Sequence, residues 1–261
     1  MSTVSRRQFI RLALGGLAIS ALSGCAPEEA LRGLATPSPP GTPLPGVTPV
    51  PTPGPSREIL RNQNITGFYV RYYKPFEAVD PARWTLSVEG LVKKPQKLTL
   101  PDVQSLPLVA QVSRMKCVEC WSAAAKWEGF RLPSLLQLVE AQPEARWVHF
   151  YCADDYFESL KIEELLEERV LFVHRMDDGP LHDLYGAPLR LIVPYKYGYK
   201  GPKAITRLVF ATEELPGFWP TAGPYTTDGE IEPGTDRPLD LGGSRRISGG
   251  EIKYPDGRES K

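Results

Sequence analysis

Residues 114–122 read Arg-Met-Lys-Cys-Val-Glu-Cys-Trp-Ser and hold the densest group of chemically reactive side chains in the chain. Nearby positive charge lowers the pKa of a thiol, so Cys117, which follows Arg114 and Lys116, is favoured as the thiolate that binds metals or attacks. The spacing of Cys117 and Cys120 fits a redox-active dithiol, half of a zinc site, or one soft-metal ligand beside an incidental cysteine. The three histidines of the chain have no zinc-site spacing, and the stretch lacks the βαβ frame of a thioredoxin-like site.

A second stretch, residues 190–207, combines positive charge with tyrosine and glycine. No carboxylate occurs between Asp183 and Glu213, and the glycines at 198 and 201 allow backbone amides to approach an anion closely. Arginine suits the geometry of phosphate, and tyrosines offer flat walls and hydroxyl donors. The stretch predicts an anion site, with a solvated basic hairpin as the alternative. Its five cations are Arg190, Lys196, Lys200, Lys203 and Arg207.

The first 24 residues resemble a twin-arginine export signal, whose substrates cross the membrane already folded. Arg6 and Arg7 precede Phe9, and the uncharged run at 12–22 is much shorter than the roughly 20 residues that span a bilayer. Ordinary secretion is the alternative. Leu-Ser-Gly-Cys at 22–25 resembles a lipoprotein cleavage box, which would make Cys25 the acylated first residue of the mature chain. We therefore expect a protein anchored by lipid at the extracytoplasmic face of the cytoplasmic membrane.

Residues 25–57 form the expected linker between this anchor and the folded domain. No charged residue occurs from Leu34 to Ser56, and proline recurs almost every second position. Such a stretch favours an extended, polyproline-like tether, which at about 3.1 Å per residue could reach roughly 100 Å.

Composition places the rest of the chain among globular proteins. Hydrophobic residues make up 41% of the 261 residues, enough for a buried core, and 31 basic side chains balance 31 acidic ones. A zero net charge gives no general attraction to nucleic acid, so we expect no nucleic-acid partner. Of the four cysteines, assigning Cys25 to lipid leaves an odd number, which argues against a disulfide-stapled scaffold.

Short strands and short helices alternate irregularly over residues 58–220. This pattern favours one α+β domain over a regular parallel βαβ sheet. Residues 221–261 are rich in Gly, Pro and Asp and predict an irregular C-terminal tail. The expected strands are 84–90, 147–152, 170–173, 189–193 and 205–210, and the expected helices are 133–139 and 162–168.

Four motifs in the same order resemble the sulfite-oxidase-type molybdopterin superfamily, and most closely its branch of periplasmic methionine sulfoxide reductases. They are residues 114–122, Trp-Glu-Gly-Phe at 127–130, Gly-Ala-Pro-Leu-Arg-Leu at 186–191, and the run at 194–203. The similarity extends over about residues 64–220. It implies a mixed-sheet α+β fold and a Mo-molybdopterin cofactor, with one molybdenum held by one pyranopterin dithiolene and one protein thiolate.

The resemblance also assigns site residues. Cys117 falls on the metal ligand, which is the catalytic position. Tyr69 and Val70 fall on an early pair that contacts the pterin. Arg190 and the turn Gly201-Pro202-Lys203 fall on residues that hold the phosphate and the pterin. The resemblance and the chemistry of the residues agree here, since a thiolate suits this metal and a basic turn suits phosphate.

Some positions depart from the family pattern. Thr66, Cys152 and Tyr185 stand at cofactor-binding positions where the family's sulfoxide reductases carry Asn, Thr and Asn. This leaves the cofactor pocket intact but the substrate open. Cys120 replaces a Gly or Ala and is interpreted as a buried apolar thiol, with a redox role as the alternative. Arg114 and Lys116 are candidates to bind an anionic or dipolar oxide or, equally, to form structural ion pairs.

The implied activity is two-electron oxygen-atom transfer at the molybdenum, with sulfoxides among the candidate substrates. No Cys-x-x-Cys-His haem motif occurs, so electrons are expected from a partner, either a membrane haem protein or a soluble cytochrome. The alternative is a non-enzymatic lipoprotein that uses the same fold as a binding or assembly module of a membrane complex.

Overall fold

The computed structural model describes residues 70, 77–232, 234–239 and 243–247, all within the unit Pro40–Lys261. The predicted export signal, Cys25 and the linker at 25–57 lie outside the described residues, as do Thr66 and Tyr69. Within the described residues, no helix is both long enough and apolar enough to cross a membrane.

The first sheet has five strands in the order β2-β1-β10-β5-β6. In β1, Leu86 and Val88 are buried and alternate with partly exposed neighbours, as the sequence pattern predicts. β1 runs parallel to β10, and the other pairs are antiparallel, so this is a mixed sheet. The strands are β1 (Thr85–Gly90), β2 (Gln96–Thr99), β5 (Trp147–Cys152), β6 (Phe157–Lys161) and β10 (Ile205–Ala211).

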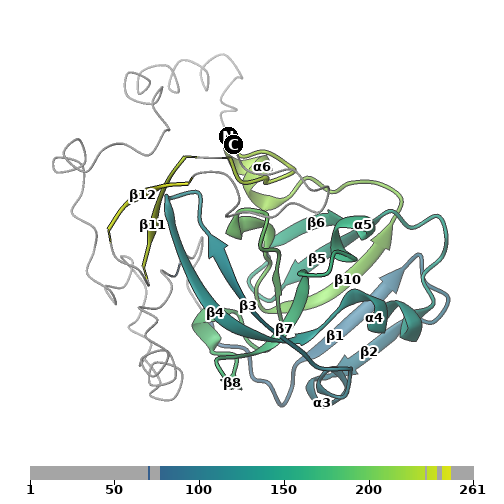
Figure 1. The fold of residues 1–261 in the computed structure, drawn as a ribbon. Coiled ribbons are helices and arrows are strands. Elements are labelled where there is room, and N and C mark those ends of the chain that lie inside the picture. The colour runs from purple at the N-terminus through teal and green to yellow at the C-terminus, as the bar shows by residue number, and fades with distance from the viewer. Residues whose placement is uncertain (1–69, 71–76, 233, 240–242, 248–261) are drawn as a thin grey trace, which may run out of the picture. The chain divides into compact units, whose positions relative to one another are not determined.

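The second sheet is built around β4, which pairs antiparallel with β3 and β7 and parallel with β11. Figure 1 shows β3 and β4 as a long curved hairpin beside β7. β9 and β8 also pair with β7, and β12 pairs with β11. The strands are β3 (Val109–Lys116), β4 (Trp121–Phe130), β7 (Leu171–Met176), β8 (Gly179–Pro180), β9 (Arg190–Ile192), β11 (Thr235–Pro238) and β12 (Arg245–Arg246).

The helices are short and fill the spaces around the sheets. α4 begins with Leu132 and Pro133, and its apolar spacing buries Leu132, Leu135 and Val139 on one side. It ends at Glu140, which adopts a left-handed φ of 51°. The helices are α3 (Leu100–Gln104), α4 (Leu132–Val139), α5 (Ile162–Leu165) and α6 (Phe218–Ala222), with the 3₁₀ turns η2 (Asp183–Tyr185) and η3 (Gly198–Lys200). Mixed sheets with short helices confirm the α+β prediction.

The main core combines residues of both sheets. Phe172 of β7 stacks on Phe130 of β4, with ring centroids 5.0 Å apart, and lies 6.1 Å from the ring of Phe150 of β5. Side chains alternate across a strand, so Leu171 and Val173 belong to a second, smaller cluster on the other side of β7. That second cluster includes Trp127 and lies next to the candidate site described below.

Two features of the second sheet were not anticipated. β4 is buried on both faces over most of its length, so its sequence has no apolar-polar alternation. The described part of the tail at 221–261, which we expected to be irregular, contains β11, whose residues Arg237 and Pro238 pair with Trp121 and Ser122. Through β11, the tail thus extends the second sheet at the end of the β3–β4 hairpin.

We expect Phe172→Ala to destabilise the protein by about 3–5 kcal/mol, because it removes the ring that joins the two sheets and leaves a cavity. Urea unfolding followed by tryptophan fluorescence measures this change. Val112→Ala is the matched control, since Val112 lies on β3 with 66% of its surface exposed, and we expect a change within about 0.5 kcal/mol. Equal losses in the two variants would contradict the proposed packing.

Candidate functional site

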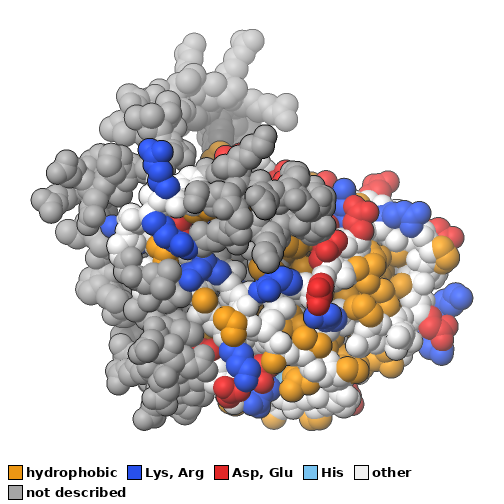
Figure 2. Space-filling view, viewed as in Figure 1, with side chains coloured by type: hydrophobic (Ala, Val, Ile, Leu, Met, Phe, Trp, Pro, Cys, Tyr) orange, Lys and Arg blue, Asp and Glu red, His pale blue; other side chains and the backbone are white. Residues whose placement is uncertain are grey.

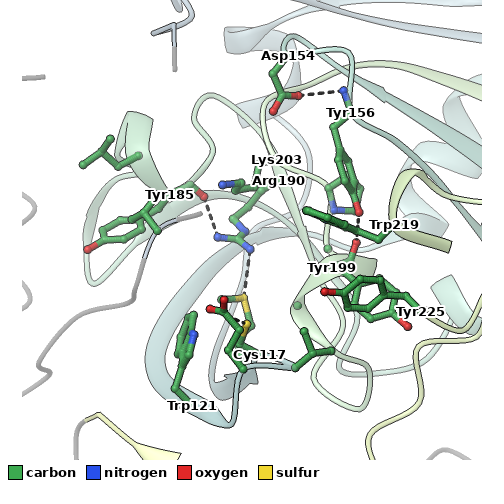
Figure 3. Close-up of a pocket in the computed structure, with 18 residues that line it drawn as sticks. Cys117, Trp121, Asp154, Tyr156, Tyr185, Arg190, Tyr199, Lys203, Trp219 and Tyr225 are labelled. Atoms are coloured by element: carbon green, nitrogen blue, oxygen red, sulfur yellow. Dashed lines mark hydrogen bonds between the residues drawn. The ribbon is translucent and has the colours of Figure 1, made fainter. Parts of the chain in front are cut away.

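One cavity of about 240 Å³ gathers the two stretches singled out in the sequence. It is bounded by the turn between β3 and β4, by η2 and β9, and by the turn after η3. Its volume is several times the roughly 30 Å³ that one water occupies in the liquid. The cavity can therefore receive an organic group, and Figure 3 shows the side chains that point into it.

Cys117 begins the tight turn that joins β3 to β4. Its backbone N–H donates to the carbonyl oxygen of Trp121 at 2.8 Å, which closes the turn, and Cys120 within it has a left-handed φ of 61°. The Cys117 side chain is half-buried and lines the cavity, with its sulfur 3.9 Å from a carboxylate oxygen of Glu119. The sulfur is thus held on a short backbone loop at the end of a hairpin.

Arg190, the first residue of β9, lines the cavity and is only 3% exposed. Its Nη1 donates to the Tyr185 carbonyl oxygen at 2.8 Å, its Nη2 lies 3.3 Å from the Met115 sulfur, and its guanidinium lies over the Trp127 ring at 5.4 Å. Its Nε has no hydrogen-bond partner among the described residues. Burial lowers the Arg190 pKa to about 10, as expected of a cation surrounded by weakly polar groups.

Lys203 supplies a second cation to the same wall. Burial, together with the charge of Arg190, lowers the Lys203 pKa to about 8, while Asp154 acts in the opposite direction. Gly186 has a φ of +104°, and a Cβ there would lie 2.7 Å from the Cβ of Lys203. Only glycine fits this position, because any side chain would displace Lys203.

The other three cations of the basic stretch do not face the cavity. Each makes an ion pair with a carboxylate from a distant part of the chain, at 2.6–3.1 Å. The five positive charges seen in the sequence therefore reduce to two at the site. The pairs are Lys196 with Glu164, Lys200 with Glu158, and Arg207 with Glu89.

The structure brings most of the predicted site residues together. Cys152 is the exception among those described: it is buried on β5 and does not line the cavity, and burial raises the pKa of its thiol. Cys120 is half-buried in the turn and is disulfide-bonded, so its interpretation as a buried apolar thiol was wrong. The predicted residues that line the cavity are Val70, Cys117, Tyr185, Arg190, Gly201, Pro202 and Lys203.

Arg114 and Lys116 were expected either to bind an oxide or, equally, to form structural ion pairs, and neither lines the cavity. Lys116 is buried and pairs with Asp236 at 2.9 Å. Arg114 donates from Nη1 to the hydroxyl of Ser122 at 3.3 Å. The alternative, a structural ion-pair role, describes Lys116 correctly.

The cavity has an aromatic wall, of which the sequence analysis anticipated only the tyrosines of the basic stretch. Tyr199 and Trp219 each lie 5.4 Å, centroid to centroid, from the ring of Tyr225, and Tyr156 donates its hydroxyl to the Tyr199 carbonyl oxygen at 2.5 Å. All four side chains line the cavity and are labelled in Figure 3. The aromatic residues at 195–199 and 218–219 were visible, but nothing in the sequence showed that these stretches meet.

Comparison with known families decides the class of this site. The family model for the oxidoreductase molybdopterin binding domain matches residues 73–219. The chain belongs to this family. It is accordingly a molybdenum-dependent oxidoreductase.

Individual members of the molybdopterin-binding family agree with this assignment. The chain is 32% identical over 257 residues to the protein-methionine-sulfoxide reductase catalytic subunit MsrP of Ralstonia nicotianae, covering 89% of this chain and 77% of that protein. It is 29% identical over 221 residues to the MsrP catalytic subunit of Gluconobacter oxydans, covering 76% and 71%. It is also 41% identical over 146 residues to the putative protein-methionine-sulfoxide reductase subunit YedZ1 of Azospira oryzae, covering 56% and 55%.

A solved structure supports the molybdopterin-binding fold. The sulfane dehydrogenase SoxCD from Paracoccus pantotrophus superposes with a TM-score of 0.58 at 18% identity, covering 66% of this chain and 51% of that chain. At this identity the likeness concerns the fold alone.

The residues of the cavity fit the molybdenum cofactor that the family binds. A thiolate is a soft ligand for the metal, and two cations suit the phosphate at the far end of the pterin: the buried Arg190, whose Nε is unsatisfied, and the half-buried Lys203. At Gly201, a Cβ would lie 2.7 Å from the Leu191 carbonyl oxygen, so the turn that carries Lys203 requires glycine. When bound, the cofactor supplies a metal that exchanges two electrons and an oxygen atom.

We expect Lys203→Met to stabilise the cofactor-free protein by about 1–3 kcal/mol at pH 7. Because the folded-state pKa of about 8 lies below the ordinary 10.5, the unfolded chain binds this proton more tightly and the charged lysine opposes folding. The penalty is complete below pH 8 and fades as pH rises to 10.5, so the advantage of the variant should fade over the same range. Urea unfolding at several pH values measures it.

The exposed Lys97→Met is the matched control for this prediction. We expect it to show no comparable gain at pH 7. A Lys203→Met protein less stable than the wild type at pH 7 would contradict the proposed electrostatic cost.

Proposed function

We propose that the protein is an exported, lipid-anchored enzyme that reduces sulfoxides by two-electron oxygen-atom transfer at a mononuclear molybdenum centre. The observation that carries this proposal is the convergence of the Cys117 sulfur, Arg190 and Lys203 on one cavity. The printed names of the Ralstonia and Gluconobacter relatives support a sulfoxide as the substrate. The cavity has one cysteine sulfur to bind one molybdenum and one pair of cations to bind one pyranopterin phosphate, which supports one cofactor per chain.

Each group at the cavity has a distinct task in this proposal. Cys117 holds the metal through its thiolate, and the hairpin turn fixes the direction of that sulfur. Arg190 and Lys203 bind the cofactor phosphate by charge-assisted hydrogen bonds, which are stronger than neutral ones. Arg190 and Lys203 would hold the phosphate end of the cofactor and Cys117 would hold its metal, so that a substrate would meet the bound cofactor in a defined orientation.

The aromatic wall suits the organic part of such a substrate. Sulfur-containing groups make favourable contacts with aromatic rings, worth roughly 0.3–1.5 kcal/mol each. Tyr199, Trp219 and Tyr225 present their rings to the cavity that also contains Cys117. A methyl sulfoxide side chain would thus be enclosed by rings while its oxygen faces the metal.

Electrons for the reduction are proposed to come from a partner, a membrane haem protein or a soluble cytochrome. The predicted lipid anchor at Cys25 and the tether at 25–57 would keep the domain near such a partner. These features support an extracytoplasmic site of action.

Molybdenum analysis and sulfoxide reduction test the proposed activity directly. Protein exported by the twin-arginine route should contain about one molybdenum and one pterin per chain and should reduce methionine sulfoxide with a reduced viologen as electron donor. Cys117→Ser should lower this activity by at least about 100-fold, since even outer-shell partners of a metal ligand cost 10–100-fold when removed.

Val112→Ala is the control, because Val112 is exposed on β3 and does not line the cavity. We expect it to retain its molybdenum. Wild-type protein without molybdenum, pterin or activity would overturn the enzyme proposal and favour the binding or assembly module.

Labelling with radioactive palmitate tests the predicted anchor. The wild type should carry label and sediment with membranes, Cys25→Ser should lose both properties, and Arg6→Lys/Arg7→Lys should accumulate in the cytoplasm. Cys152→Ser, which removes a different thiol, should behave as the wild type. Labelled, membrane-bound Cys25→Ser protein would show that the anchor lies elsewhere.

A further inference from the structure

The C-terminal segment, which lies beyond the matched family domain at 73–219, pairs with the end of the β3–β4 hairpin. β11 lies parallel to the start of β4. The Arg237 N–H donates to the Cys120 carbonyl oxygen at 2.7 Å, and the Leu239 N–H donates to that of Ser122 at 2.9 Å. Two backbone hydrogen bonds therefore hold the exit of the turn that carries Cys117.

Asp236 of β11 holds both strands of the hairpin at once. Its side chain is only 1% exposed. Oδ1 lies 2.9 Å from Lys116 Nζ, and Oδ2 accepts from the Ser122 hydroxyl at 2.8 Å. Lys116 and Ser122 are the last facing residues of β3 and β4 before the turn. One buried carboxylate thus fastens the base of the Cys117 loop.

Lys116 also connects this loop to the basic turn. Its backbone forms a bridge with Tyr197, and a Cβ at Gly198 would lie 3.5 Å from the Lys116 carbonyl oxygen. The residue before Cys117 therefore contacts the stretch that leads to Lys203 through its backbone and the C-terminal segment through its side chain. Displacing Lys116 would shift the sulfur relative to both cations of the cavity.

Asp236 also balances charge beside the sulfur. Lys116 is 6% exposed, and among the described carboxylates only Asp236 forms an ion pair with it. Arg245 lies 4.0 Å from the other oxygen, Oδ2. A buried charge acts over a longer range than an exposed one, because the interior screens it weakly.

We propose that Asp236 is a positioning residue that fixes the Cys117 loop and, by neutralising Lys116, sets the reduction potential of the metal bound there. The proposal rests on the part of the proposed function that makes Cys117 the metal ligand, and it is independent of the substrate. It assigns a role in the cofactor site to a residue outside the family domain.

Four proteins test the electrostatic half of this inference: the wild type, Asp236→Asn, Lys116→Gln and the double variant. In redox titrations of the molybdenum EPR signal, Asp236→Asn leaves an extra positive charge and should shift the potential upward, since positive charge favours the reduced metal. Lys116→Gln should shift it downward, and the double variant should return close to the wild type. A purely structural role predicts no opposite shifts, so unchanged or same-direction shifts would overturn the proposal.

Hydrogen exchange in the cofactor-free proteins tests the positioning half without any metal. Asp236→Asn should speed exchange of the 117–122 amides by at least about tenfold, which corresponds to about 1.4 kcal/mol. Exchange in β5 should stay constant, and Glu140→Gln, which removes an exposed partner of Lys94, is the matched control. Unchanged exchange at 117–122 would refute positioning, even if the wild type binds no molybdenum.

If Asp236→Asn does not fold, Ser122→Ala replaces it, since this change removes the hydroxyl that donates to Asp236 and accepts from Arg114 but leaves the ion pair between Lys116 and Asp236. It should speed exchange at 117–122 while leaving the potential near that of the wild type. A change in potential without a change in exchange would contradict the division of roles between the two contacts.

Discussion

Two cations share one wall of the cavity, and the charge of each disfavours the other. Arg190 has a buried Nε without a hydrogen-bond partner among the described residues, and Lys203 has its pKa lowered by burial and by Arg190. Binding of an anionic ligand would stabilise a protein with such a pair of cations, because the attraction compensates for the hydration that the cations lose on folding. The nearby lysines at 196 and 200 do not line the cavity and form ion pairs with Glu164 and Glu158. Arg190 and Lys203 are thus the cations of the basic stretch that line the cavity.

The second sheet fixes the distance between Arg190 and the Cys117 sulfur. Arg190 lies on β9, which pairs with β7, and β7 pairs with β4, the strand that follows the Cys117 turn. Cys117 and Arg190 are therefore linked through the hydrogen-bonded strands β4, β7 and β9 of one sheet. One face of this sheet packs in the main core, which includes Phe172. Because packed interiors resist small displacements, the two ends of the cofactor site are held in a fixed relation.

The sequence predicted local features well and long-range pairings poorly. Alternation located β1, composition marked Cys117 and the basic turn, and the resemblance assigned Arg190 and Lys203. It could not show that three of the five cations are paired, because their carboxylates at 89, 158 and 164 lie far away along the chain. β4 escaped notice for a similar reason. Its burial on both faces comes from neighbours that only the folded chain provides.

The residues that form the site extend beyond the segment that matches the family model. The segment that matches the family model ends at residue 219. Two residues beyond it contact residues of the matched segment: Tyr225 packs on Trp219, and Asp236 pairs with Lys116. A buried lysine next to a metal ligand without its carboxylate would carry an uncompensated charge, which typically costs several kcal/mol. The C-terminal segment therefore contributes Tyr225 to the cavity and Asp236 to the base of the Cys117 loop, and a chain ending at 220 would lack both.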